Sequence, residues 1–312
     1  MKKQKMVKIV SVISVLLSVL VLAAVLLPRE ASTGVLYRVS GGKQDLYLLG
    51  SIHVGSKDMY PFGSAIEKAL KESEVLVFEC DTQSSAGVEQ TAQLMRYEDG
   101  TTLGEHVSED CMEDVKSVAQ KLGFDIRALE KLKPWAVTSL LSMDTLSAEM
   151  GTRDVHEAAS LGVETVMHSY VGNKPVAYLE TVQEQLLLMD SFSPQLQEHL
   201  LSSACRAILE PETAVDEELE NWPLWWKEGN AQAFADSYLA GLAKEENPAL
   251  AQEYHDALIT ERNCSMAQKI QTLLEGENSC FVTVGLMHLV LPEDSIIAEL
   301  EAMGYQVDKI EN

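Results

Sequence analysis

Two kinds of hydrophobic pattern follow one another along the chain. Short apolar runs that are typical of strands cover residues 35–39, 45–49, 75–78, 175–179, 281–284 and 305–310. Amphipathic patterns predict helices over residues 64–73 and 295–303, and the stretches 84–161 and 182–274 are mostly helical in character. Strands that alternate with helices indicate an α/β fold.

The order of these segments predicts a central mixed β-sheet with surrounding helices. Glycines at 41 and 42 between the first two runs favour an antiparallel hairpin, whereas the continuous apolar run 75–78 favours a buried parallel strand. A large helical insertion separates the terminal strands. The sequence shows no convincing domain boundary, so residues 31–312 are expected to form one domain.

The first thirty residues differ from this body. Lysines at 2, 3, 5 and 8 precede residues 9–28, which contain no charged residue and would span about 30 Å as a helix. We predict an uncleaved transmembrane signal anchor at residues 1–30, which leaves the body extracytoplasmic and the protein single-pass in the cell membrane. The alternative is cleavage near Ala31 and secretion.

Charge and cysteine content narrow the classes of function. The formal net charge is −24 at pH 7, and nucleic-acid binding needs a surplus of Lys and Arg, so no nucleic-acid partner is expected. The five cysteines show no C-x-x-C spacing, which argues against a structural zinc cluster and favours small buried residues for most of them.

Two copies of a Gly-x-x-His pattern follow apolar runs at opposite ends of the chain. The first places His53 after Gly50, and the second places His288 after Gly285. Open α/β sheets carry ligand sites at the carboxyl ends of their strands, so the two ends could lie side by side in one sheet. Glu79 follows a third run. Asp81 is a second candidate carboxylate, which would share a face with Glu79 if that strand continued.

Two imidazoles and a carboxylate are a usual set of ligands for a divalent metal with open positions for water. We therefore expect His53, His288 and Glu79 to bind the metal, with Mn, Co or Zn as candidates, and Glu79 could instead act as general base. Spacing alone is weak support, because a histidine after a strand is more often structural.

A family resemblance strengthens this interpretation. The residues that carry it are 48–55, 77–79, 179–185, 261–263 and 285–289, and together they resemble the TraB/GumN family. That family includes the Tiki metalloproteases and is related to erythromycin esterases and the haem-binding lipoprotein ChaN. The resemblance implies a metal-dependent hydrolase site of His53, Glu79 and His288, with Arg262 and Asn263 as catalytic, substrate-facing or supporting groups. Met287 departs from the usual Gly-x-Gly-His-Leu motif and could narrow the pocket.

The expected function is a membrane-anchored hydrolase, a peptidase above all, that acts on a peptide or small-molecule substrate. The alternatives are a non-enzymatic protein that binds haem, a peptide signal or another small ligand at the same residues, and an interaction protein with a decayed site.

Glu180 is a further candidate for the site, or it starts a helix. Trp222, Trp225 and Trp226 share a helical face, which favours core packing over a groove for an apolar or peptide substrate.

Overall fold

A six-stranded mixed sheet forms the centre of the protein in a computed structural model, which describes residues 30–81, 91–149, 155–210 and 219–311. Its strands lie in the order β4-β3-β5-β2-β1-β6. They are β1 (Leu36–Ser40), β2 (Leu46–Ser51), β3 (Val75–Phe78), β4 (Val176–Tyr178), β5 (Cys280–Gly285) and β6 (Gln306–Lys309). The first four in spatial order are parallel, and β1 is antiparallel to β2 and β6. The predicted α/β fold with a mixed sheet is confirmed.

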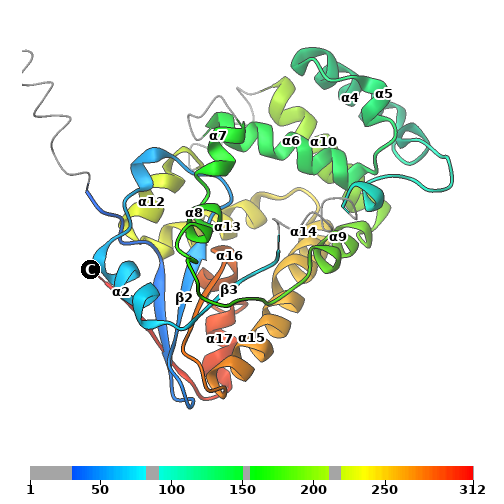
Figure 1. Cartoon of the computed structure of the whole chain (residues 1–312). Coiled ribbons are helices and arrows are strands. Elements are labelled where there is room, and N and C mark those ends of the chain that lie inside the picture. Colours follow the sequence, from blue (N-terminus) through cyan, green and yellow to red (C-terminus); the bar gives the residue numbers. More distant parts are fainter. Residues whose placement is uncertain (1–29, 82–90, 150–154, 211–218, 312) are drawn as a thin grey trace, which may run out of the picture.

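Helices account for most of the remaining described chain. They are α2 (Ser64–Glu72), α4 (Glu109–Leu122), α5 (Ile126–Leu129), α6 (Pro134–Glu149), α7 (Val155–Ser160), α8 (Val163–His168), α9 (Val182–Asp190), α10 (Pro194–Leu209), α12 (Trp222–Glu228), α13 (Ala231–Lys244), α14 (Pro248–His255), α15 (Glu261–Leu274), α16 (Met287–Val290) and α17 (Ile296–Ala302). A π-helical turn, Asp256–Thr260, joins α14 to α15. Helices α4, α6 and α10 pack together in a separate lobe, at the top of Figure 1.

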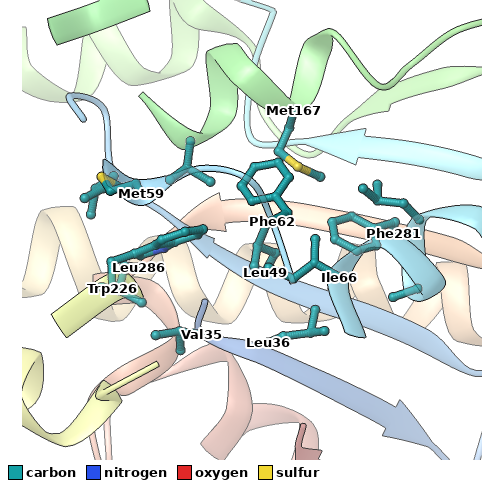
Figure 2. Packing of buried hydrophobic residues seen from close by; sticks show 14 of the residues in the cluster. Val35, Leu36, Leu49, Met59, Phe62, Ile66, Met167, Trp226, Phe281 and Leu286 are labelled. Carbon is teal, nitrogen blue, oxygen red and sulfur yellow. The ribbon is translucent and has the colours of Figure 1, made fainter. Parts of the chain in front are cut away.

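The sheet buries apolar side chains on both faces, because successive residues of a strand point to opposite sides. On one face Phe281 and Leu49 pack with α2 and with Trp226 of α12, as Figure 2 shows. On the other face Val282 and Val284 pack with α15 and α17. The result is a three-layer α/β/α arrangement, which explains why the central strands are apolar without alternation.

Membrane crossing is not seen in the described part of the chain. No helix there combines the length and the apolar character that a bilayer requires. The predicted anchor lies in the N-terminal residues 1–29, outside the described ranges.

The five cysteines are all described and all free, and four of them are buried, as the sequence predicts for most.

Candidate functional site

The two Gly-x-x-His motifs meet at the carboxyl ends of neighbouring parallel strands. In the ladder between β2 and β5, Gly50 pairs with Val284 and Ser51 with Gly285. The Leu286 N–H donates to the Ser51 carbonyl at 2.8 Å, which ties the motifs together beyond the ladder. A Cβ on Gly50 would lie 2.3 Å from Leu286 Cδ1. A larger residue at position 50 would therefore displace the Leu286 side chain, because the second motif packs directly against this glycine.

A cavity of about 240 Å³ opens at this point. Ser51, His53, Glu79, Arg262 and His288 contribute its polar lining, and Trp222, Phe234, Leu286 and Met287 are among its apolar walls. Glu79 and His288 are each 5% exposed, so both lie in a largely water-free environment. The structure thus brings His53, Glu79, Arg262 and His288 to one cavity, and Asn263 contacts His288 without lining the cavity itself.

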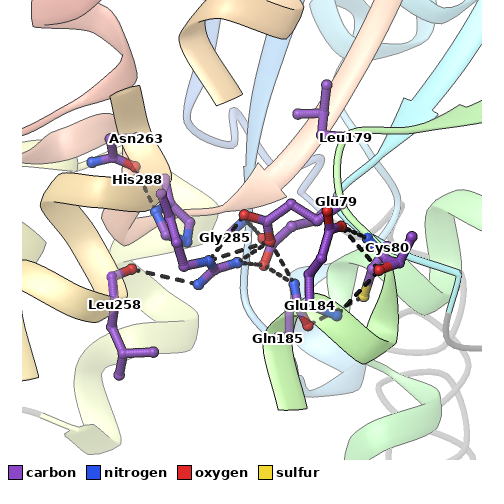
Figure 3. A network of polar contacts seen from close by, with 12 residues as sticks. Glu79, Cys80, Leu179, Glu184, Gln185, Leu258, Asn263, Gly285 and His288 are labelled. Carbon is purple, nitrogen blue, oxygen red and sulfur yellow. Dashed lines mark hydrogen bonds and ion pairs between the residues drawn. The ribbon is translucent and has the colours of Figure 1, made fainter. Parts of the chain in front are cut away.

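Glu79 is held by a dense set of donors, part of which Figure 3 shows. Gln185 Nε2 donates to Oε1 at 2.8 Å, the Gly285 N–H donates to Oε2 at 2.8 Å, and the guanidinium of Arg262 forms an ion pair with Oε1. Burial by itself raises the pKa of this carboxyl, but the positive charge that His288 carries when protonated in acid, the charges of Arg262 and of protonated His53, and the Gly285 N–H outweigh it and lower the pKa to about 2. Glu79 is therefore an anion at neutral pH.

Arg262 lies between two carboxylates. Its Nη2 donates to Glu79 and, at 2.7 Å, to Oε2 of Glu180, and its Nε lies 3.2 Å from both oxygens of Glu180. Burial lowers the pKa of Arg262, and the bonds and charges of the two glutamates raise it further than burial lowers it. Since most of its donors are taken by carboxylates, Arg262 lines the cavity mainly as the counter-ion that positions Glu79.

His288 has a defined tautomer. Asn263 Nδ2 donates to the Asp294 carbonyl at 2.8 Å, so its Oδ1 accepts from Nδ1 of His288 at 2.6 Å. Burial lowers the pKa of His288 to about 4, although the charge of Glu79 acts in the opposite direction. The ring is therefore neutral at pH 7, and Nε2 carries a lone pair. The π-helical turn just before Arg262 and Asn263 belongs to a rare class of structure that is frequent at functional sites.

The metal-binding hypothesis can be tested against these donor atoms. A Cβ built on Gly285 would lie 3.3 Å from Glu79 Oε2 and 3.7 Å from His288 Nε2, so both atoms face one small space beside this glycine. His53 lines the same cavity, but its side chain is 67% exposed. Within the described ranges no three His, Cys, Asp or Glu side chains form a ready metal-holding group. Two possible donor atoms thus lie beside one space, and His53 is at the rim of the cavity.

Sequence reasoning missed several residues near the site. Glu164 of α8 is buried, has one oxygen 4.0 Å from His53 Nδ1, and has a pKa raised to about 8 by burial and by the charge of Glu79. The buried hydroxyl of Ser51 has no hydrogen-bond partner among the described residues. No local motif surrounds Glu164, so only the tertiary contact identifies it.

Asp81, the second candidate carboxylate, lies away from the cavity. Strand β3 ends at Phe78, so Glu79 and Asp81 do not share a strand face. Asp81 hydrogen-bonds Tyr178 instead and does not line the cavity. Glu180 does reach the site, because its backbone N–H donates to the Glu79 carbonyl at 2.7 Å and its carboxylate pairs with Arg262.

Comparisons with known proteins agree with the sequence resemblance. The sequence pattern of the TraB/PrgY/gumN family matches residues 35–309. Two relatives, both called uncharacterized protein YbaP, come from Escherichia coli strain K12 and from Shigella flexneri. Each is 26% identical over 148 residues, which cover 47% of this chain and 53% of the relative. The alignment thus spans about half the length of these relatives. No solved structure matches the chain.

Proposed function

The chain belongs to the TraB/PrgY/gumN family, and we propose that it is a metal-dependent hydrolase that cleaves peptides. The observation that carries the proposal is the pairing of a neutral His288 Nε2 with an ionised Glu79 Oε2 beside one small space. An imidazole nitrogen and a carboxylate oxygen are suitable ligands for Mn, Co or Zn. When bound, such a metal would supply a water of lowered pKa and polarise the scissile carbonyl.

The chain's own residues would prepare this site. Asn263 keeps the proton of His288 on Nδ1, so the lone pair of Nε2 is available to a metal. Arg262 and Gln185 hold Glu79 in place. His53 is the candidate for the third ligand, because it lines the same cavity. Apolar walls and the burial of Glu79 and His288 limit the contact of these two groups with bulk water, which strengthens their electrostatic interactions with a bound substrate.

The location of the body outside the cytoplasm is part of the proposal. The uncharged residues 9–28 after the N-terminal lysines support a single-pass anchor. A fusion of alkaline phosphatase to the C-terminus would be active if the body is exported, and an inactive fusion that is made at normal levels would contradict this location.

Metal analysis is the direct test of the hydrolase proposal. The full chain would be incubated with Mn²⁺, Co²⁺ or Zn²⁺, dialysed, and compared with a His53→Ala/His288→Ala double variant. His106→Ala is a matched control, since His106 does not line the cavity. We expect near-stoichiometric metal in the wild type and the control alone, followed by metal-dependent cleavage in a peptide library.

Metal in all three proteins, or in none, would contradict the proposal. A haem titration would then test the binding-protein alternative. A Soret band that is lost in His53→Ala would favour that alternative.

A further inference from the structure

A second cavity of about 300 Å³ lies beside the site cavity. Trp222 and Met287 line both, so these two side chains form a shared wall. Met287 directly precedes His288 in the sequence, and helix α13, which lines the second cavity, packs against α16. The two cavities therefore adjoin across Trp222 and Met287.

The lining of this second cavity is apolar and aromatic. Leu196, Leu200, Leu242, Leu250 and the rings of Trp222, Tyr238 and Tyr254 face it. Two of its polar groups already have partners, since Tyr238 Oη lies 3.0 Å from Nδ1 of His255. In addition, His199 Nε2 lies 3.2 Å from Oε1 of Glu245. An uncharged apolar group would thus be the preferred occupant.

We infer that this cavity is an apolar subsite that binds a bulky aromatic or branched aliphatic side chain of the substrate, adjacent to the bond that is cleaved. The inference rests on the proposed peptide hydrolysis. The volume is at the lower end of the range for ligand pockets, about 300–1,000 Å³, which fits a single large side chain. Aromatic walls favour an aromatic occupant through edge-to-face contacts.

Gly241 offers a way to fill the subsite without disturbing the fold. It lies in α13 and lines the cavity, and a Cβ built on it meets no atom within 4 Å. Its backbone is not in the left-handed region, and leucine is a better helix former than glycine. Gly241→Leu should therefore fold normally and occlude the subsite. Ala243→Leu is the matched control, because Ala243 is exposed on the same helix and does not line the cavity.

The test measures binding rather than hydrolysis, so it is independent of the metal. Dissociation constants of the full chain for N-acetylphenylalanine amide, N-acetylalanine amide and octanamide would be determined by ligand-observed NMR. We expect wild type and Ala243→Leu to bind the phenylalanine compound at least about tenfold more tightly than the alanine compound. Gly241→Leu should lose most of that preference.

Three outcomes would overturn the subsite: equal or undetectable binding of the two amino-acid amides by the wild type, an unchanged preference in Gly241→Leu, or tighter binding of octanamide. A preserved preference in the His53→Ala/His288→Ala variant would separate this inference from the proposed chemistry. If that variant keeps the preference while the wild type takes up no metal, the subsite stands and the hydrolase proposal fails.

Discussion

Nδ1 of His288 lies 2.6 Å from Oδ1 of Asn263, a residue 25 positions earlier in the chain. Asn263 is 1% exposed and is itself fixed by the Asp294 carbonyl. This contact determines which nitrogen of His288 carries the proton. Asn263 does not line the cavity, but it thereby leaves Nε2 of His288 with a free lone pair in the cavity.

Removal of the Asn263 amide should weaken metal binding. Asn263→Ala leaves the His288 ring free to turn and its Nδ1–H without a partner, and loss of such a supporting hydrogen bond costs about 10–100-fold in metal affinity. Asn263→Asp keeps an acceptor and should retain most of the affinity. Competition with a chromophoric chelator would measure both variants. If both bind metal as the wild type does, Nε2 of His288 is not a ligand.

Arg262 should be essential for stability as well as for the site. Arg262→Ala leaves the buried carboxylates of Glu79 and Glu180 without a counter-ion, and loss of one partner of a buried pair costs about 3–5 kcal/mol. Arg38→Ala is the matched control, because Arg38 pairs with Asp45 on the surface and such pairs contribute about 1 kcal/mol or less. Urea unfolding measures both free energies. Similar losses in the two variants would show that the buried network does not stabilise the fold.

The strands and both histidine motifs were predictable because their signals are local. Apolar runs that end in glycine mark β2 and β5, and the structure places them side by side as expected, as parallel neighbours. The family resemblance pointed to Arg262 and Asn263, whose roles depend on α15 packing against the sheet. Periodicity alone would have left Arg262 on a helix surface.

Other features could not be read from the sequence, because they depend on tertiary packing. Glu164 lies near His53 because α8 begins beside the end of β2, where the Val163 N–H donates to the Ile52 carbonyl at 3.0 Å. The shared face of Glu79 and Asp81 depended on the strand continuing through Asp81, and β3 ends one residue before Glu79. Of the three tryptophans, Trp226 is fully buried, as core packing predicts, whereas Trp222 lines two cavities.

His168 should make stability depend on pH in the weakly acidic range. Its ring stacks on Phe78 with centroids 3.9 Å apart, and burial lowers its pKa although Asp81 acts in the opposite direction. Below about pH 6.5 the unfolded chain therefore binds this proton more readily than the folded chain, so stability falls as the pH decreases.

His168→Gln should reduce the loss of stability between pH 7.5 and 5.5, because the glutamine takes up no proton in this range. His156→Gln, at an exposed position, is the control. Urea unfolding across this pH range would measure the difference, and an equal loss in wild type and His168→Gln would contradict the assignment.

Gly285 gives the sharpest test of the space between the two donor atoms. An alanine Cβ there would lie 3.2 Å from His288 Cδ2 and 3.3 Å from Glu79 Oε2, so it would occupy the position that a metal or water needs. The φ angle of Gly285 is not in the left-handed region, so the backbone accepts alanine without strain. A Gly-to-Ala replacement also stabilises the folded protein by about 0.4–1 kcal/mol, because it reduces the conformational entropy of the unfolded chain. This gain offsets the cost of the tight contacts. We expect metal uptake and hydrolysis to fall at least about tenfold, while the free energy of unfolding changes by about 1 kcal/mol or less.

Gly104→Ala is the control for this substitution. Its Cβ would make only ordinary contacts, 3.8 Å from Met112 Cγ, in the helical lobe away from the site. It should leave metal uptake unchanged. Elemental analysis and urea unfolding of both variants, side by side with wild type, separate loss of the site from loss of the fold. Full metal uptake by Gly285→Ala would place the metal elsewhere, because the methyl group and a metal bound to Glu79 Oε2 and His288 Nε2 would compete for the same space.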